Sequence, residues 1–583
     1  MSGYGNFDCD PVIQISEVET DCLTGWSEVF RQLKREIPQS GKYVVALECY
    51  PGVSLDMLEQ SLKVAFTGSQ ILNVQEAYRS SEELQTDVAS VLTDDPVFGF
   101  MQTWNITQFF EERQLHELKS AVGASSSLTI LIGTGTTHVV SEPNLLLHAS
   151  VTRWELQRRQ RAGKIGNLGL ENIGAPPSLL YKNAFFLEWR LADDIRHAIY
   201  NNVDYFLDLD VSDEPHMVAG ETLRRGIQAA VQRPFRVVPF FDPGPWGGYW
   251  MKETFDLPEG PPNYAWCFDC VPEENSVNLG FGSRHFVMPA ITLVHEQPSA
   301  LLGEAVYKKF GAEFPIRFDL LDTVGGGNLS LQVHPLPKYI REQFGMPYTQ
   351  DESYYILDNR EGSELYLGLR EGVRPEEMRL DLEAAQRGEQ PFPAEQYVNV
   401  WPTRKHDHFS IPAGTIHCSG SDNLVLEISA TPYIFTFKLW DWERVGLDGK
   451  PRPIHIEHGL ANIQWDRDTA WVRRELLNQV EILAEGDGWR EERTGLHSAQ
   501  FLETRRTWFT KLVHYDTNAN LHVLNLVEGE AVVVESPCGA FEPLEIHYAE
   551  TFIVPAAIGA YTIRPLSEAT RPLGIIRAYL RTE

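Results

Sequence analysis

Cysteine is scarce in this chain. Its 583 residues contain only seven cysteines, an odd number that is unlike a disulfide framework, so we expect reduced thiols. Cys267 and Cys270 form one CxxC, but no second ligand pair follows at the spacing of a structural zinc site. We therefore interpret them as two partly buried thiols near a turn.

Long apolar runs and a secretory signal are also lacking. No stretch approaches the roughly 18 consecutive apolar residues of a membrane-spanning helix. The opening MSGYGNFDCD has neither the charged nor the apolar region of a signal peptide. We therefore expect a cytoplasmic protein with no membrane partner.

Basic residues are in deficit. Fifty Lys and Arg against 81 Asp and Glu give a formal charge of -31, spread along the chain. A nucleic-acid partner requires a basic stripe, so nucleic acid is excluded as a partner. The densest basic stretch, residues 153–164, is interpreted as the exposed face of one helix.

What is present is ordinary globular composition, with 43% hydrophobic and 22% charged residues. In the first 230 residues, apolar runs that resemble doubly buried strands (43–48, 127–133, 144–150 and 204–210) alternate with helical patterns. This alternation predicts an α/β domain with a doubly wound, mostly parallel sheet over residues 1–230.

The first strand enters CYPGVSLDMLEQSL, where a nucleotide kinase would carry its phosphate loop. That loop requires GxxxxGK[ST], and here Gly52 stands alone. The segment ending SVTRWELQRRQRAG faintly resembles the strand and lid helix of uridine-kinase-like folds. We predict a P-loop-kinase-like architecture with a degenerate phosphate loop, whose role the sequence leaves open.

The composition of the chain changes at residues 232–250, which are rich in Pro, Gly and aromatic residues. Short strands with Gly and Pro turns follow, as in an antiparallel sandwich or barrel. We predict a first barrel with a helical insertion at 231–470 and a second barrel at 471–583. The phrase HFSIPAGTIH (408–417) recurs as TFIVPAAIGA (551–560), which supports the duplication.

The strongest motif is NLSLQVHP, residues 328–335. In a strand, Ser330, Gln332 and His334 point to one face because side chains alternate. Glu352 opens a later strand, and the PAG turn delivers His417 on another. Two imidazoles, a carboxylate and an amide oxygen suit zinc or another divalent ion and leave a coordination position open.

These motifs resemble class I mannose-6-phosphate isomerases, zinc enzymes of the cupin (jelly-roll) fold. The similarity covers roughly residues 235–583 and includes, in order, PFFDPGPWGG, EFPIRFDLLD, NLSLQVHP, ESYYILD, DHFSIPAGTIHCSG, LVLEIS and FKLWDWERVGLDGKPRPIHIEHGL. The resemblance implies that Gln332, His334, Glu352 and His417 hold one metal ion. Because Ala560 aligns with His417, we expect this metal in the first barrel only.

The resemblance also assigns further residues to the site. It places Lys438 where the family has an arginine and makes Glu427 a carboxylate that shuttles protons. Ser330 corresponds to a substrate contact, Trp246 would pack on a sugar face, and Arg317 would face the substrate.

Two departures from the family concern the charge of the site. Gln350 and Asp319 stand where the family usually has lysines. A site with fewer cations binds phosphate less well, so whether the sugar is phosphorylated stays open.

Two functions are consistent with these residues. The first is a zinc-dependent aldose-ketose isomerase that interconverts mannose 6-phosphate and fructose 6-phosphate, or a related sugar, through an enediol. The alternative is a non-catalytic or regulatory metal-containing sugar-binding protein. In both, the partner is a small sugar or sugar phosphate, and the sequence leaves the oligomeric state open.

Overall fold

The computed structural model describes residues 6–581, except 432, 447–448, 450–451 and 496. The chain divides into two compact units. The α/β unit comprises residues 12–230 and 276–296, and the barrel unit comprises the residues up to Pro11, 231–275 and 297–583. The expectation of a multidomain chain is therefore confirmed, whereas the three predicted domain limits stay predictions.

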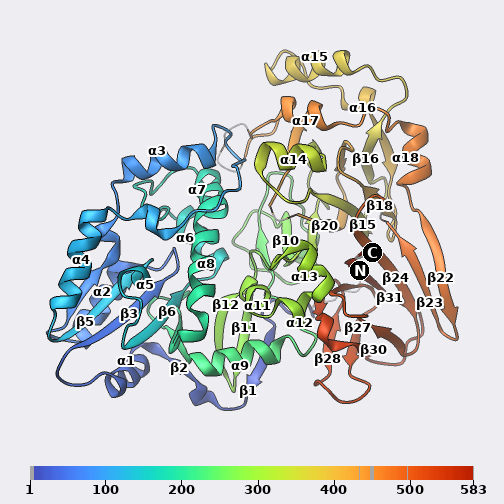
Figure 1. Ribbon diagram of the computed structural model, residues 1–583. Helices are drawn as coiled ribbons and strands as arrows, with labels where there is room; N and C mark the ends of the chain where they lie inside the picture. The colour runs from blue at the N-terminus through green and yellow to red at the C-terminus, as the bar shows by residue number, and fades with distance from the viewer. Residues whose placement is uncertain (1–5, 432, 447–448, 450–451, 496, 582–583) are drawn as a thin grey trace. The chain divides into compact units, whose positions relative to one another are not determined.

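The α/β unit is built on a seven-stranded sheet in the order β2-β8-β7-β6-β3-β5-β4 (Figure 1). Its five strands from β7 to β4 are parallel, and β8 and β2 complete one edge in antiparallel orientation. The strands are β2 (Cys22–Thr24), β3 (Tyr43–Cys49), β4 (Gln70–Asn73), β5 (Leu128–Gly133), β6 (Leu145–Ser150), β7 (Tyr205–Asp208) and β8 (His216–Ala219). The apolar runs of β3, β5, β6 and β7 are largely buried, as expected for strands covered on both faces, whereas β4 at the edge is partly exposed.

Helices alternate with these strands along the chain, as the sequence predicts. They are α1 (Gly25–Glu36), α2 (Leu55–Ala65), α3 (Ser81–Leu92), α4 (Glu112–Ala124), α5 (Thr136–Val139), α6 (Arg153–Arg161), α7 (Pro177–Asn183), α8 (Trp189–Ile199) and α9 (Gly220–Ala230). After β3 the chain adds strands on one side of the sheet, and after β5 it crosses to β6 on the other side. The strand order therefore reverses between β3 and β6.

Residues 276–296 belong to the α/β unit although they follow the change in composition at residue 232. Strand β11 (Ser276–Phe281) pairs in parallel with β1 (Val12–Ser16) and antiparallel with β12 (Arg284–Pro289). The short helix α11 (Ile291–Glu296) follows.

The prediction that residues 153–164 form the exposed face of a basic helix is wrong for two of its arginines. In α6, Arg153 is fully buried and Arg159 is 8% exposed. Arg159 donates hydrogen bonds to the carbonyls of Gly52, Leu209 and Asp210, and Arg153 pairs with a buried aspartate. A guanidinium with several acceptors can be buried, which a charge pattern alone does not reveal.

The first barrel of the barrel unit has two facing antiparallel sheets. One runs β18-β15-β20-β13-β10-β9 and the other β17-β16-β19-β14-β21. The strands are β9 (Phe240–Asp242), β10 (Trp266–Cys270), β13 (Arg317–Asp322), β14 (Leu331–Val333), β15 (Asp351–Asn359), β16 (Glu364–Leu369), β17 (Val398–Pro402), β18 (His408–Ile411), β19 (His417–Ser419), β20 (Asn423–Ala430) and β21 (Phe437–Trp440).

Helices of the barrel unit lie between these strands or lead from the first barrel to the second in sequence. They are α10 (Trp250–Thr254), α12 (Pro298–Leu302), α13 (Glu304–Phe310), α14 (Pro337–Phe344), α15 (Pro375–Gln386), α16 (Ala394–Tyr397), α17 (Ile456–Asn462) and α18 (Thr469–Glu475).

The second barrel repeats the strand order of the first. Its sheets run β29-β26-β31-β24-β23-β22 and β28-β27-β30-β25, so strands β24 to β31 take the places of β13 to β20. They are β22 (Val480–Gly486), β23 (Trp489–Thr494), β24 (Leu502–Phe509), β25 (Val513–Asp516), β26 (His522–Glu528), β27 (Ala531–Glu535), β28 (Leu544–His547), β29 (Thr551–Val554), β30 (Ala560–Pro565) and β31 (Leu573–Leu580). Ala560 begins β30 as His417 begins β19, and its register partner is Asp516.

Two further expectations concern cysteines and membranes. All seven cysteines are free thiols, and Cys267 and Cys270 are buried. Within the described part of the chain, no helix is both long and apolar enough to cross a membrane.

Candidate metal centre

Strand β14 places three predicted site residues in one row. Gln332 lies directly opposite His417 of β19 on one side and opposite Lys438 of β21 on the other. Residues directly opposite each other on antiparallel strands point to the same face of the sheet. The register therefore puts Gln332, His417 and Lys438 on one face of the sheet.

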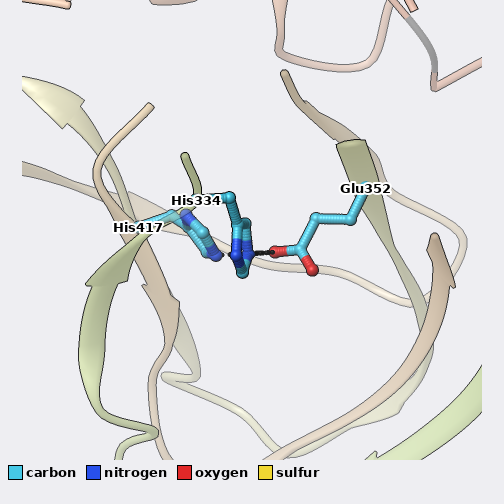
Figure 2. A group of neighbouring side chains, drawn as sticks. All are labelled: His334, Glu352 and His417. Carbon is cyan, nitrogen blue, oxygen red and sulfur yellow. Dashed lines mark ion pairs between the residues drawn. The ribbon is translucent and has the colours of Figure 1, made fainter. Parts of the chain in front are cut away.

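Glu352 comes from the other sheet and meets the two histidines. Its Oε1 lies 2.6 Å from Nε2 of His417 and 3.1 Å from Nε2 of His334. Figure 2 shows both imidazole rings turned toward this carboxylate. All three side chains are buried, and one potential ligand atom from each lies within 4.8 Å of the others.

Backbone carbonyls fix which nitrogen of each ring faces inward. Nδ1 of His334 lies 2.8 Å from the carbonyl of Phe435, and Nδ1 of His417 lies 2.9 Å from that of Thr415. A carbonyl only accepts hydrogen bonds, so each Nδ1 carries the proton and each Nε2 presents a lone pair.

When both rings are neutral, three electron-pair donors therefore meet at one point. The orphaned atoms include Nε2 of His334 and Oε1 of Glu352, neither of which has a hydrogen-bond partner among the described residues. Two imidazole nitrogens and a carboxylate that converge on one point fit a divalent cation.

Gln332 is adjacent to the three candidate ligands, but its side-chain amide is turned so that its nitrogen faces them. Its amide Nε2 lies 3.2 Å from Nε2 of His417, so the amide nitrogen and not the oxygen faces the group. An amide ligand to a metal must present its oxygen, which here requires a half-turn of the amide. Gln350 donates to Oε2 of Glu352 at 3.2 Å and so holds the second carboxylate oxygen.

Glu427 of β20 lies among other acids on the sheet that also holds Glu352. It is directly opposite Asp319 of β13 and Tyr354 of β15, two residues beyond Glu352. Burial and the carboxylates of Glu352 and Asp319 raise the pKa of Glu427 well above its usual value. Burial likewise raises the pKa of Asp319 to about 7, although Arg317 opposes this from 3.7 Å.

A group of cations lies beside the row of β14. Ser330 donates to Oδ1 of Asp441 at 2.8 Å, and Arg452 and Arg444 both pair with the same aspartate, at 2.9 Å and 2.8 Å. Burial, together with the charges of Arg452 and Arg444, lowers the pKa of Lys438 to about 7. Two arginines thus share one carboxylate, and Lys438 lies close enough for their charges to act on it.

The motif LWDWER and the residues after it contain Asp441, Arg444 and Arg452, yet the sequence analysis did not single them out. Their charged residue types were visible, but only the fold shows that they meet Ser330.

Trp246, the predicted contact with a sugar face, is buried. It is 3% exposed and packs edge-on against Trp266 at a centroid distance of 4.7 Å, so it lies in the core of its loop. Its contact with a sugar stays a prediction.

Comparison with family models finds one match, described as a domain of unknown function (DUF8485), over residues 25–232. This match covers most of the α/β unit before residue 230 and gives it no activity. The predicted relation of this unit to kinases stays a prediction.

Comparison with known proteins finds similarity elsewhere. The chain is 25% identical over 232 residues, 40% of its length, to mannose-6-phosphate isomerase ManA of Bacillus subtilis. It is 26% identical over 217 residues, 37% of its length, to mannose-6-phosphate isomerase of Streptococcus mutans. These matches span 68% and 63% of the two relatives.

Among solved structures, the mannose 6-phosphate isomerase of Bacillus subtilis is 17% identical with a TM-score of 0.48. That match covers 60% of this chain and all of the other. The sequence matches consistently name one kind of enzyme, and they confirm the resemblance that the motifs predicted. Over about 40% of its length, this chain is therefore related to the mannose-6-phosphate isomerases, a class of aldose-ketose isomerases.

Proposed function

We propose that this chain is a zinc-dependent aldose-ketose isomerase that interconverts mannose 6-phosphate and fructose 6-phosphate or a close relative. The observation that carries the proposal is the meeting of two imidazole nitrogens and one carboxylate oxygen within 4.8 Å inside the first barrel. The related enzymes are named for this reaction.

The donor set favours zinc. His334, Glu352 and His417 supply two nitrogen ligands and one oxygen ligand, a set that catalytic zinc sites use. Three protein ligands leave a position for water or substrate, and Gln332 is close enough to add a fourth ligand if its amide turns. When bound, a divalent metal supplies Lewis acidity that polarises a carbonyl.

The basic group beside the site supports a phosphorylated substrate. Lys438, Arg444 and Arg452 outnumber Asp441, so a phosphate placed among them would restore charge balance. Ser330 lies between this group and Gln332 and can donate to a phosphate oxygen once it leaves Asp441. This group supplies positive charge in place of the two lysines that the related family usually has at positions 350 and 319.

Proton movement between neighbouring carbons requires a group that can hold and release a proton. Glu427 faces the barrel interior, and burial together with the neighbouring carboxylates raises the pKa of its carboxyl well above its usual value, which favours the protonated form. Asp319, directly opposite, is a second carboxyl that can exchange that proton. We propose that this pair transfers the proton during enediol formation.

A matched pair of histidine variants tests the proposal. In a coupled assay of zinc-loaded full-length protein, we expect metal-dependent formation of fructose 6-phosphate from mannose 6-phosphate. His417→Ala should lose both bound metal and turnover, because it removes one of three ligands. His514→Ala changes an exposed histidine of β25 and should keep both. Turnover by His417→Ala equal to that of the unmodified protein contradicts the proposal.

A second candidate function is a metal-containing sugar-binding protein without catalysis. Asp319 and Gln350, which stand where the related family usually has lysines, favour it. Solvent deuterium separates the two functions, because an isomerase exchanges it into carbon 1 or 2 of the sugar. Saturable binding of mannose 6-phosphate without exchange would support the binding protein.

A further inference from the structure

The PAG turn, residues 412–414, lies between β18 and β19 and precedes the candidate ligand His417. The backbone N–H of Gly414 in this turn donates to the carbonyl of His334 at 3.0 Å. The turn therefore contacts the backbone of one candidate ligand and leads directly into the other. A shift of the turn would change the distance between the two imidazoles.

The same turn is tied to the third candidate ligand. The backbone N–H of Ala413 donates to Oδ1 of Asp351 at 2.8 Å, and Asp351 is the residue before Glu352 on β15. One short turn thus contacts, or leads into, the segments that carry all three candidate ligands.

Arg467 binds the carbonyl groups of this turn. Its Nη1 lies 2.9 Å from the carbonyl oxygen of Pro412 and 2.7 Å from that of Ala413. The same nitrogen also donates to Oγ1 of Thr415. A guanidinium carries donors only, so one arginine can hold several acceptors that lie close together.

Thr415 connects this arginine to the imidazole of His417. Its hydroxyl accepts from Arg467, and its backbone carbonyl lies 2.9 Å from Nδ1 of His417. That carbonyl fixes the ring so that Nε2 faces Glu352. A single residue therefore links the guanidinium of Arg467 to the orientation of a candidate ligand.

The segment before Arg467 packs closely against the turn. The backbone N–H of Gln464 donates to the carbonyl of Gly414 at 2.9 Å. Gly414 has φ +83°, and a Cβ on it would lie 2.8 Å from the carbonyl oxygen of Asn462. The turn therefore has little room to move toward this segment.

Arg467 is itself held by contacts outside the turn. Its carbonyl accepts from the backbone N–H of Leu369 at 3.0 Å, and its guanidinium lies over the ring of Trp471, 5.1 Å from the centroid. The carboxylates of Asp351 and Asp466 also act on its charge. A side chain that is held in this way can fix the groups that it binds.

We propose that Arg467 is a positioning residue of the metal centre, whose guanidinium fixes the PAG turn and so holds His417 in the orientation that binds the metal. The inference rests on the proposed function and adds a residue to it. Arg467 lies after the last of the family motifs, so the sequence analysis did not single it out.

The test measures the zinc affinity of full-length protein by competition with a chromogenic chelator, at a temperature below unfolding. Arg467→Met should raise the Kd for zinc about 10–100-fold, the usual effect of losing a group that orients metal ligands. Arg467→Lys keeps the charge and can still donate to the turn, so it should raise the Kd less. Arg474→Met changes an exposed arginine of α18 and should leave the Kd unchanged.

Thermal unfolding of the metal-free proteins separates positioning from a loss of stability. A purely structural role lowers the metal-free Tm of Arg467→Met and leaves the zinc Kd of the folded protein unchanged. A zinc Kd of Arg467→Met equal to that of the unmodified protein therefore overturns the proposal. If Arg467→Met does not fold, Arg467→Gln takes its place, and an unchanged Kd in that variant overturns the proposal equally.

The His417→Ala protein separates this inference from the proposed function. If His417→Ala binds zinc as tightly as the unmodified protein, the metal centre and the role of Arg467 are both overturned. Zinc binding that depends on both His417 and Arg467 but gives no turnover overturns the isomerase alone and supports the role of Arg467.

Discussion

At the scale of the residue, single hydrogen bonds decide the chemistry of the candidate metal centre. His334 and His417 each donate Nδ1–H to a backbone carbonyl, which turns both lone pairs toward Glu352. The sequence motifs placed these residues in one predicted site, and the structure brings their side chains together. They did not reveal the carbonyl partners, because Phe435 and Thr415 contribute main-chain atoms that every residue has.

A substitution at Lys438 tests the proposed phosphate contact. Because a hydrogen bond to a charged group contributes about 1.5–3 kcal/mol, Lys438→Met should raise KM for mannose 6-phosphate about 10–100-fold. Steady-state kinetics of Lys438→Arg, which keeps the charge, should give a much smaller rise. An unchanged KM in Lys438→Met would remove Lys438 from the substrate site.

At the scale of the element, strand register brings the site together. Strand β14 is only three residues long, yet it pairs with both β19 and β21 and so aligns Gln332 with His417 and Lys438. Alternation along the strand predicted only that Ser330, Gln332 and His334 share a face. The neighbouring strands could not be predicted from alternation, because pairing depends on contacts between distant parts of the chain.

A glycine near β23 fixes the position of a buried histidine. A Cβ on Gly495 would lie 2.0 Å from the ring of His408, which is buried and lies 2.9 Å from Oγ of Ser353. Gly495 also has φ +83°. Gly495→Ala should therefore lower the free energy of unfolding by more than about 3 kcal/mol, measured by denaturant titration.

Gly372→Ala is the matched control for that prediction. Gly372 has φ +79° but open space around its Cβ position, so alanine there adds only backbone strain of about 1–2 kcal/mol. Similar losses in the two variants would show that His408 moves aside and that the contact is not restrictive.

At the scale of the whole molecule, the chain combines two compact units. The proposed metal centre lies within the barrel unit. A repeated eight-strand order in the barrel unit shows that one architecture can have the candidate ligand His417 in one copy and Ala560 in the other. The barrel fold alone therefore does not create a metal site; the side chains at these positions do.

Metal removal should act on only one unit. A ligand that binds the native state stabilises it by mass action, so chelation should lower the thermal transition of the barrel unit by about 5–15 °C. The transition of the α/β unit should stay unchanged in the same calorimetric scan. His417→Ala protein should not respond to the chelator, and an equal response there would place the metal elsewhere.

The sequence by itself determined the alternation of strand and helix, the antiparallel texture after residue 232, and the motifs that carry the metal ligands. These are local patterns, set by side-chain periodicity and turn residues. Only the tertiary structure decided that Arg153 is buried beside Asp193, that Asp319 faces Glu427, and that residues 276–296 return to the α/β unit. The reason is that burial and pairing join residues far apart in the chain, where no local pattern can specify the partner.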